Sequence, residues 1–86
     1  MQEVFIEDFS SPGCVDCPAV KALLEHLSGE LDCELIVEEV DITVDPTRAA
    51  GYGIMSVPAI AINGILKFIG LPEKEELKKA ILDELE

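Results

Sequence analysis

The regular alternation of strand-like and helix-like segments constrains the fold of this 86-residue chain most strongly. Short apolar runs typical of strands lie at residues 4–9, 35–42, 57–62 and 65–69. Between the first two runs, apolar residues at helical spacing predict a helix over about 15–27. Asp45-Pro46 resembles a helix cap and predicts a short second helix that ends at Gly51 or Gly53. A further apolar stripe predicts a last helix from near Pro72.

This order predicts an α/β fold of the type βαβαββα, with a four-stranded mixed sheet flanked by helices. The first two strands should be parallel because a helix joins them. Asn63-Gly64 predicts a tight hairpin between the last two strands. The whole chain, 1–86, is expected to form one domain. In such sheets, ligands and chemistry collect at the carboxyl ends of the strands.

A Cys14-Val15-Asp16-Cys17 motif follows the first strand at that end of the sheet. Cysteines three residues apart at the first turn of a helix can close a small disulfide ring or open to a dithiol. If Cys14 lies at the helix cap, the unpaired amides and the helix dipole favour its thiolate. Thiol–disulfide exchange is therefore the leading hypothesis, with Cys14 as nucleophile and Cys17 as resolving cysteine.

Cys33 is the third cysteine. A count of three is low, and because it is odd the cysteines cannot all pair, so a scaffold held together by disulfides is not expected. We interpret it as a small apolar residue in the second strand. A zinc site built from Cys14, Cys17, His26 and Cys33 is an alternative, but a continuous helix would carry His26 away from the cysteines. A second alternative is a noncatalytic interaction module that uses the fold as a scaffold.

The composition limits the possible partners. Eighteen acidic and six basic residues give a formal net charge of −12, which argues against nucleic acid and against anionic membrane surfaces. The charge fits a role in solubility alone equally well. Because Met1-Gln2-Glu3 carries no positive charge and no apolar run reaches the length of a signal sequence, we expect a cytoplasmic protein.

Three segments resemble the thioredoxin/glutaredoxin superfamily, closest to compact archaeal thioredoxin-like proteins of glutaredoxin size. They are residues 9–18 around the cysteines, residues 52–60 with the Tyr-Gly-Ile-x-x-Val-Pro pattern, and Asn63-Gly64 with Phe68-Ile69-Gly70. The resemblance implies a thioredoxin fold, a cis peptide bond at Pro58, and Val57 backbone groups that pair with an extended substrate. It also implies protein disulfide substrates, a flavin-dependent thioredoxin-reductase-like partner and no bound cofactor. We expect a monomer.

The chain departs from larger thioredoxins in ways that affect docking and redox potential. Gly13 replaces a tryptophan, Val15-Asp16 replaces Gly-Pro, and the additional amino-terminal strand and helix are absent. Residues 70–73 also lack the Gly-Gly and aspartate with which glutaredoxins bind glutathione, so glutathione-coupled activity remains only an alternative.

Asp8 lies at the spacing from Cys14 at which larger thioredoxins carry a buried carboxylate that assists proton transfer. Such a role requires burial to raise its pKa. Glu7 is the rival, and strand alternation predicts that only one of the two faces inward under the site. An ordinary solvated or capping carboxylate is the alternative for Asp8.

The residues around the cysteines suggest a direction and a docking surface. Asp16, in an acidic protein, disfavours a thiolate, so we predict a reductant; a simple helix-dipole role for Asp16 would carry no such prediction. An apolar rim could form a docking patch for extended polypeptide, made of Pro12, Val15, Met55 and Val57, with core packing as the alternative for Val57. We interpret Lys21, Arg48 and His26 as surface residues.

Overall fold

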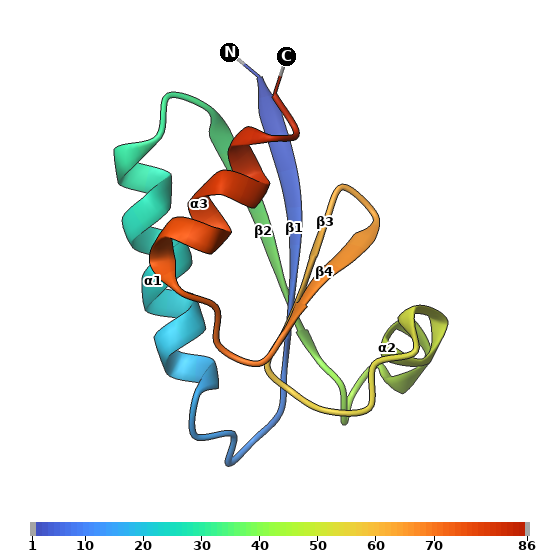
Figure 1. The fold of residues 1–86 in the computed structure, drawn as a ribbon. Helices are drawn as coiled ribbons and strands as arrows, with labels where there is room; N and C mark the ends of the chain where they lie inside the picture. Colours follow the sequence, from blue (N-terminus) through green and yellow to red (C-terminus); the bar gives the residue numbers. More distant parts are fainter. Residues whose placement is uncertain (1, 86) are drawn as a thin grey trace.

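The computed structural model describes residues 2–85. Figure 1 shows the alternation expected from the sequence. The elements are β1 (Glu3–Ser10), α1 (Cys17–Glu30), β2 (Glu34–Asp41), α2 (Pro46–Tyr52), β3 (Ala59–Ile62), β4 (Ile65–Ile69) and α3 (Lys74–Leu82). This is the predicted βαβαββα arrangement, and the α/β fold class is confirmed.

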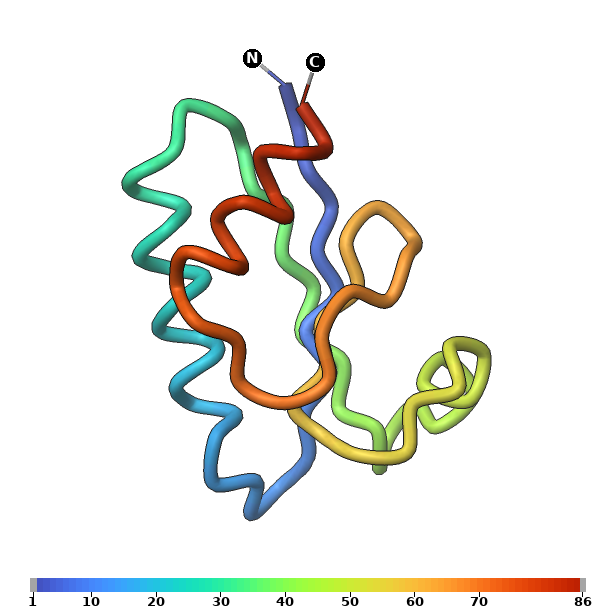
Figure 2. The backbone as a smooth tube through the Cα atoms, viewed as in Figure 1, coloured from blue at the N-terminus to red at the C-terminus, as the bar shows by residue number. Residues whose placement is uncertain are grey.

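The four strands form one mixed sheet in the order β2-β1-β3-β4. β1 is parallel to β2 with Glu3 opposite Glu34, as the intervening helix predicted. β3 is antiparallel to both β1 and β4. The backbone trace in Figure 2 shows β1 running through the middle of the molecule, so the turn that follows it opens at one end of the sheet.

Helices cover both faces of the sheet (Figure 1). Val4 and Ile6 of β1 belong to a core cluster that α1 and α3 complete with Val20, Leu24, Leu27, Leu77 and Ile81. Phe9 belongs to a second cluster that includes Ala49 of α2. Because successive strand residues face opposite sides, each face of β1 has its own core.

The helix ends follow local signals, with some shifts from the predicted bounds. α1 begins at Cys17, and its N-cap is Asp16, which makes no side-chain capping bond. Cys14 therefore lies before the cap, which corrects the expectation that it occupies the cap itself. Asp45 caps α2 by accepting a bond from the Arg48 amide, as predicted, and α2 ends at Tyr52 with Gly53 as its C-cap, at a φ of 73°.

The Asn63-Gly64 hairpin forms as predicted, with φ values of 49° and 83°. Both are positive, as a type I′ turn requires. The Asn63 side chain also accepts a 2.9 Å hydrogen bond from the Phe5 amide, which ties the turn to β1. β3 begins at Ala59 rather than at residue 57, so Val57 and Pro58 lie in the loop before the strand.

Candidate active site

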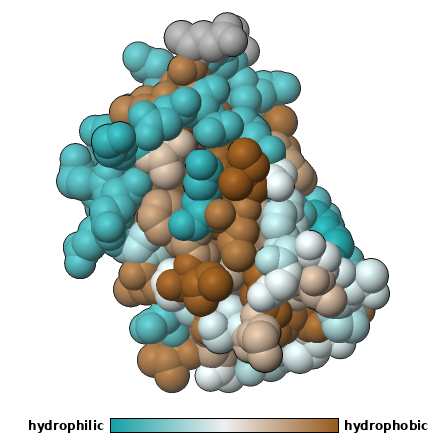
Figure 3. Space-filling model, turned by 45° about the vertical axis from the view of Figure 1, so that its right-hand side comes forward, coloured by the Kyte–Doolittle hydropathy of each residue, from teal (hydrophilic) through white to brown (hydrophobic). Residues whose placement is uncertain are grey.

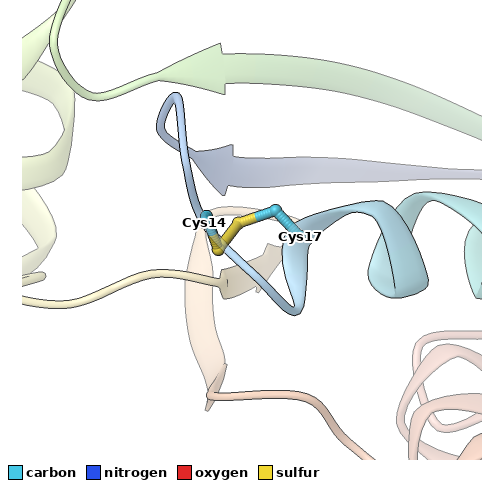
Figure 4. Close-up of a disulfide and its surroundings, with 2 residues drawn as sticks. All are labelled: Cys14 and Cys17. Atoms are coloured by element: carbon cyan, nitrogen blue, oxygen red, sulfur yellow. A yellow bond between two sulfur atoms is a disulfide. The ribbon is translucent and has the colours of Figure 1, made fainter.

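Cys14 and Cys17 form a disulfide between the end of β1 and the start of α1 (Figure 4). Their Cα atoms are 5.4 Å apart. Cys14 lies in the turn, where its amide donates to the Ser11 carbonyl at 3.2 Å, and Cys17 is the first residue of the helix. The two sulfurs differ in their surroundings, because Cys14 is partly exposed whereas Cys17 is 9% exposed.

A hollow of about 400 Å³ opens beside this disulfide. Both cysteines line it, together with Asp8, Lys21 and Glu39. The hollow therefore joins the redox pair to a group of ionisable side chains that come from β1, α1 and β2.

Asp8 is the most deeply buried ionisable group of this hollow. It is 3% exposed, and its Oδ1 atom has no hydrogen-bond partner. Burial, reinforced by the nearby Glu39 carboxylate, raises the pKa of Asp8 from 3.8 to about 6, while Lys21 acts in the opposite direction. A carboxyl with this pKa can accept and release a proton near neutral pH.

Lys21 and Glu39 of the lining form an exposed ion pair, with Nζ and Oε1 3.2 Å apart. They also line a second hollow with Asp8, between α1 and β2, and the cysteines are not part of its lining. Lys21 is thus a surface residue, as interpreted from the sequence, yet it is one of the charges that act on Asp8.

Glu7 faces the opposite side of β1 from Asp8, so only Asp8 faces the site, as strand alternation predicted; that Glu7 is buried as well was not predicted. It is 6% exposed, and it points to the face of β1 opposite Asp8, where the Arg48 guanidinium lies 2.6 Å from its carboxylate. The Tyr52 hydroxyl donates to its other oxygen. Strand alternation therefore holds, and the burial of Glu7 follows because helices cover both faces of this sheet.

Arg48 also differs from its interpretation as a plain surface residue. Its side chain is one third exposed, and it bonds both Glu7 and Glu38. Sequence reasoning missed this role because the residues lie far apart in the chain. A glutamate within an otherwise apolar run was the one available signal, since a buried carboxylate needs a partner.

The loop between α2 and β3 lies at the same end of the sheet as the turn between β1 and α1 that carries Cys14 (Figure 1). Its Val57–Pro58 peptide bond is cis. The Pro58 carbonyl accepts a 2.7 Å bond from the Gly70 amide. Met55 is 95% exposed and Val15 90% exposed, whereas Val57 is half-buried and packs against the second core cluster.

Hydrophobic side chains also reach the surface elsewhere. In the view of Figure 3, hydrophilic residues cover the upper left of the molecule, and hydrophobic residues emerge in its middle and lower parts. Exposed large hydrophobic residues include Val15 and Met55, and also Ile65, Ile69 and Leu71 around β4.

The remaining predicted residues lie outside the hollow beside the cysteines. Cys33 is buried in the first core cluster, one residue before β2. His26 is exposed on α1, 3.4 Å from Glu30. Among residues 2–85, no group of three or more His, Cys, Asp or Glu side chains is placed to hold a metal ion. Within the same range, no helix is both long and apolar enough to span a bilayer.

Together, the mixed sheet and the bonded Cys-x-x-Cys pair at the carboxyl end of β1 define a thiol–disulfide oxidoreductase with a thioredoxin fold. A dithiol at this position can reduce a disulfide by two successive exchanges.

The sequence matches the family described as "Thioredoxin domain" over residues 3–82. It is 47% identical over 83 residues to a "Probable Thioredoxin" of Methanothermobacter thermautotrophicus, which covers 96% of this chain and 98% of the relative. It is 46% identical over 81 residues to a "Thioredoxin" of Methanocaldococcus jannaschii, covering 94% and 95%. The solved structure of a mutant thioredoxin from Halobacterium salinarum shares the fold, with a TM-score of 0.80, 24% identity, and coverage of 99% and 77%.

The chain belongs to the thioredoxin domain family. The resemblance seen in its motifs is thereby confirmed, including its closeness to compact archaeal members. The family and the cysteine pair support thiol–disulfide oxidoreductase activity on protein disulfides, and they favour it over the zinc-binding and noncatalytic alternatives.

Proposed function

We propose that this chain is a protein disulfide reductase and electron carrier of the cytoplasm. The observation that carries the proposal is the asymmetry of the bonded pair: Cys14 is partly exposed, whereas Cys17 is buried beside a buried carboxyl. The exposed sulfur can meet a substrate, and the buried one can reach only Cys14.

In the proposed reaction, the Cys14 thiolate attacks a substrate disulfide and forms a mixed disulfide, while the other substrate sulfur leaves as a thiolate that takes up a proton. Cys17 then loses its proton and attacks the Cys14 sulfur. This step releases the second substrate thiolate and leaves the Cys14–Cys17 disulfide. The substrate gains two electrons, and the protein loses two.

Asp8 is proposed as the base that takes the Cys17 proton. It lines the same hollow as Cys17, and its pKa of about 6 leaves most of it ionised at neutral pH. Replacing Asp8 with Asn should therefore slow resolution of the mixed disulfide. An unchanged resolution rate would remove Asp8 from the mechanism.

The docking surface is proposed to lie around the disulfide. Pro12 and Met55 are exposed, whereas Val57 is half-buried and Pro58 is buried, both in the loop between α2 and β3. We call residues 54–57 the docking segment. The backbone groups of Val57 would pair with an extended stretch of the substrate, as the family resemblance implies.

Recycling is proposed to require a flavin-dependent, thioredoxin-reductase-like partner, and the protein itself to need no bound cofactor. The proposal takes residues 1–86 as one monomeric domain. The acidic surface supports partners that are neutral or basic where they dock, rather than nucleic acid or an anionic membrane.

Trapping experiments test the assignment of the two cysteines. With reduced protein and insulin, Cys17→Ser should accumulate a covalent mixed disulfide, because Cys14 attacks but nothing resolves the product. Cys14→Ser should trap none, and Cys33→Ser should reduce insulin as the unaltered protein does. A mixed disulfide that forms through Cys17 in the Cys14→Ser variant would contradict the assignment.

A further inference from the structure

α2 is held to the sheet by few apolar contacts. It has seven residues, and Ala49 is the one that is buried. Tyr52 adds an edge-to-face contact with Phe9, at 5.6 Å between ring centroids. Because a helix this short has little stability of its own, its position depends on what fastens it to the sheet.

A polar network supplies that fastening, centred on the buried carboxylate of Glu7. One carboxylate oxygen accepts from Arg48 at 2.6 Å, and the other accepts from the Tyr52 hydroxyl. Arg48 also makes two bonds to Glu38 of β2, at 2.7 and 3.0 Å. The network therefore joins α2 to two neighbouring strands, and each of its groups has a charged or hydroxyl partner.

The docking segment begins directly beyond this fastened helix. α2 ends at Tyr52 with Gly53 as its C-cap, and the Ile54 amide donates to the Ala49 carbonyl at 2.9 Å. Ile54 is 7% exposed, whereas Met55 next to it is 95% exposed. Directly after the segment, the Pro58 carbonyl accepts a hydrogen bond from the Gly70 amide. The position of α2 thus fixes one end of the segment.

We propose that Glu7, Arg48 and Tyr52 are positioning residues that hold the docking segment for polypeptide disulfides. The proposal rests on the function proposed above. The network lies on the face of β1 opposite Asp8, so it acts on substrate docking and not on the cysteine chemistry. It should matter for a disulfide in an extended polypeptide, which uses the segment, and not for a small disulfide, which needs only Cys14.

Tyr52→Phe tests this with the least disturbance, because it removes the hydroxyl that donates to Glu7 and keeps the ring that contacts Phe9. Arg48→Met is the stronger variant, because it leaves the Glu7 charge unpaired; where it fails to fold, Tyr52→Phe decides. Glu30→Gln is the matched control. Glu30 forms a comparable network with Lys74 and Lys78 that fastens α3 to α1, away from the docking segment.

Each reduced variant is mixed with insulin at increasing concentration, and separately with the small aromatic disulfide 5,5′-dithiobis(2-nitrobenzoate). For Tyr52→Phe, we expect the half-saturating insulin concentration to rise roughly three- to tenfold, the range set by loss of one hydrogen bond. The maximal rate, the small-disulfide rate and all Glu30→Gln values should stay within about twofold of the unaltered protein.

Three results would overturn the proposal. One is an unchanged half-saturating concentration in the folded variants, which would make the network purely stabilising. Another is an equal loss of rate with the small disulfide, which would place its effect at the cysteines. The third is an equal rise of the half-saturating insulin concentration in Glu30→Gln, which would show that the rise comes from a general loss of stability. Failure of the unaltered protein to reduce insulin would instead refute the proposed function, and this inference with it.

Discussion

At the scale of residues, two adjacent carboxyl groups of β1 show how surroundings decide a role. Glu7 and Asp8 are both buried, yet Glu7 has a guanidinium and a hydroxyl as partners, whereas Asp8 has an oxygen with none. A paired buried carboxylate is stable as a charge, and an unpaired one is poised to take up a proton. The first therefore suits a structural tie and the second suits proton transfer.

Asp8→Asn should stabilise the oxidised protein at high pH. The folded-state pKa of Asp8, about 6, exceeds its ordinary value of 3.8, so the folded chain binds the proton more tightly. The free energy of unfolding of the unaltered protein therefore falls as pH rises from the ordinary pKa of 3.8 to the folded-state pKa of about 6. The fall is up to about 3 kcal/mol, at roughly 1.4 kcal/mol for each pKa unit. Urea unfolding at several pH values should show the variant more stable above pH ~6, with the difference fading below pH ~4.

The exposed Asp32→Asn serves as a control for the loss of one negative charge. If Asp8→Asn gained no more stability at high pH than Asp32→Asn, the Asp8 charge would not be desolvated in the folded protein.

At the scale of elements, two glycines near the end of α2 have opposite conformational needs. Gly53 has a φ of 73°, in the left-handed region, whereas Gly51 lies within the helix, and a Cβ at either position would meet no atom within 4 Å. Gly53→Ala should therefore destabilise by about 1 kcal/mol, and Gly51→Ala should stabilise by roughly 0.5–1 kcal/mol. Urea midpoints measure both, and a stabilising Gly53→Ala would contradict the assigned end of α2.

Local signals predicted most of the elements. Asp45-Pro46 marked the start of α2, Asn63-Gly64 marked the hairpin, and the apolar periods placed the sheet and the helices. These predictions succeeded because each depends on a few neighbouring residues. The family motifs around Cys14 and Val57 added the fold and the chemistry.

The remaining features depend on contacts between distant segments. The Glu7–Arg48 bond joins residues 41 positions apart, and the sequence around either residue does not predict its partner. The start of α1 at Cys17, after the predicted residue 15, depends on how the turn after β1 closes. Sequence periods describe one element at a time, so they missed that a second helical layer buries Glu7.

At the scale of the whole molecule, the formal net charge of −12 acts over dimensions of 33 × 23 × 17 Å. The Debye length is about 30 Å at 0.01 M salt and about 3 Å at 1 M, so low salt leaves the self-repulsion of the acidic surface unscreened. The melting temperature should therefore rise between these salt concentrations. A fall would show that the ion pairs, which salt also screens, contribute more than the repulsion costs.

The measurement that tests the central claim most directly is the equilibrium potential of the Cys14/Cys17 couple, with Cys33 replaced by serine so that one pair reports. A value near ~−270 mV, as in thioredoxin, is the result predicted for a reductant, whereas a value near ~−120 mV would reverse the direction of electron flow. If no intramolecular disulfide formed at any buffer potential, the oxidoreductase account would be wrong.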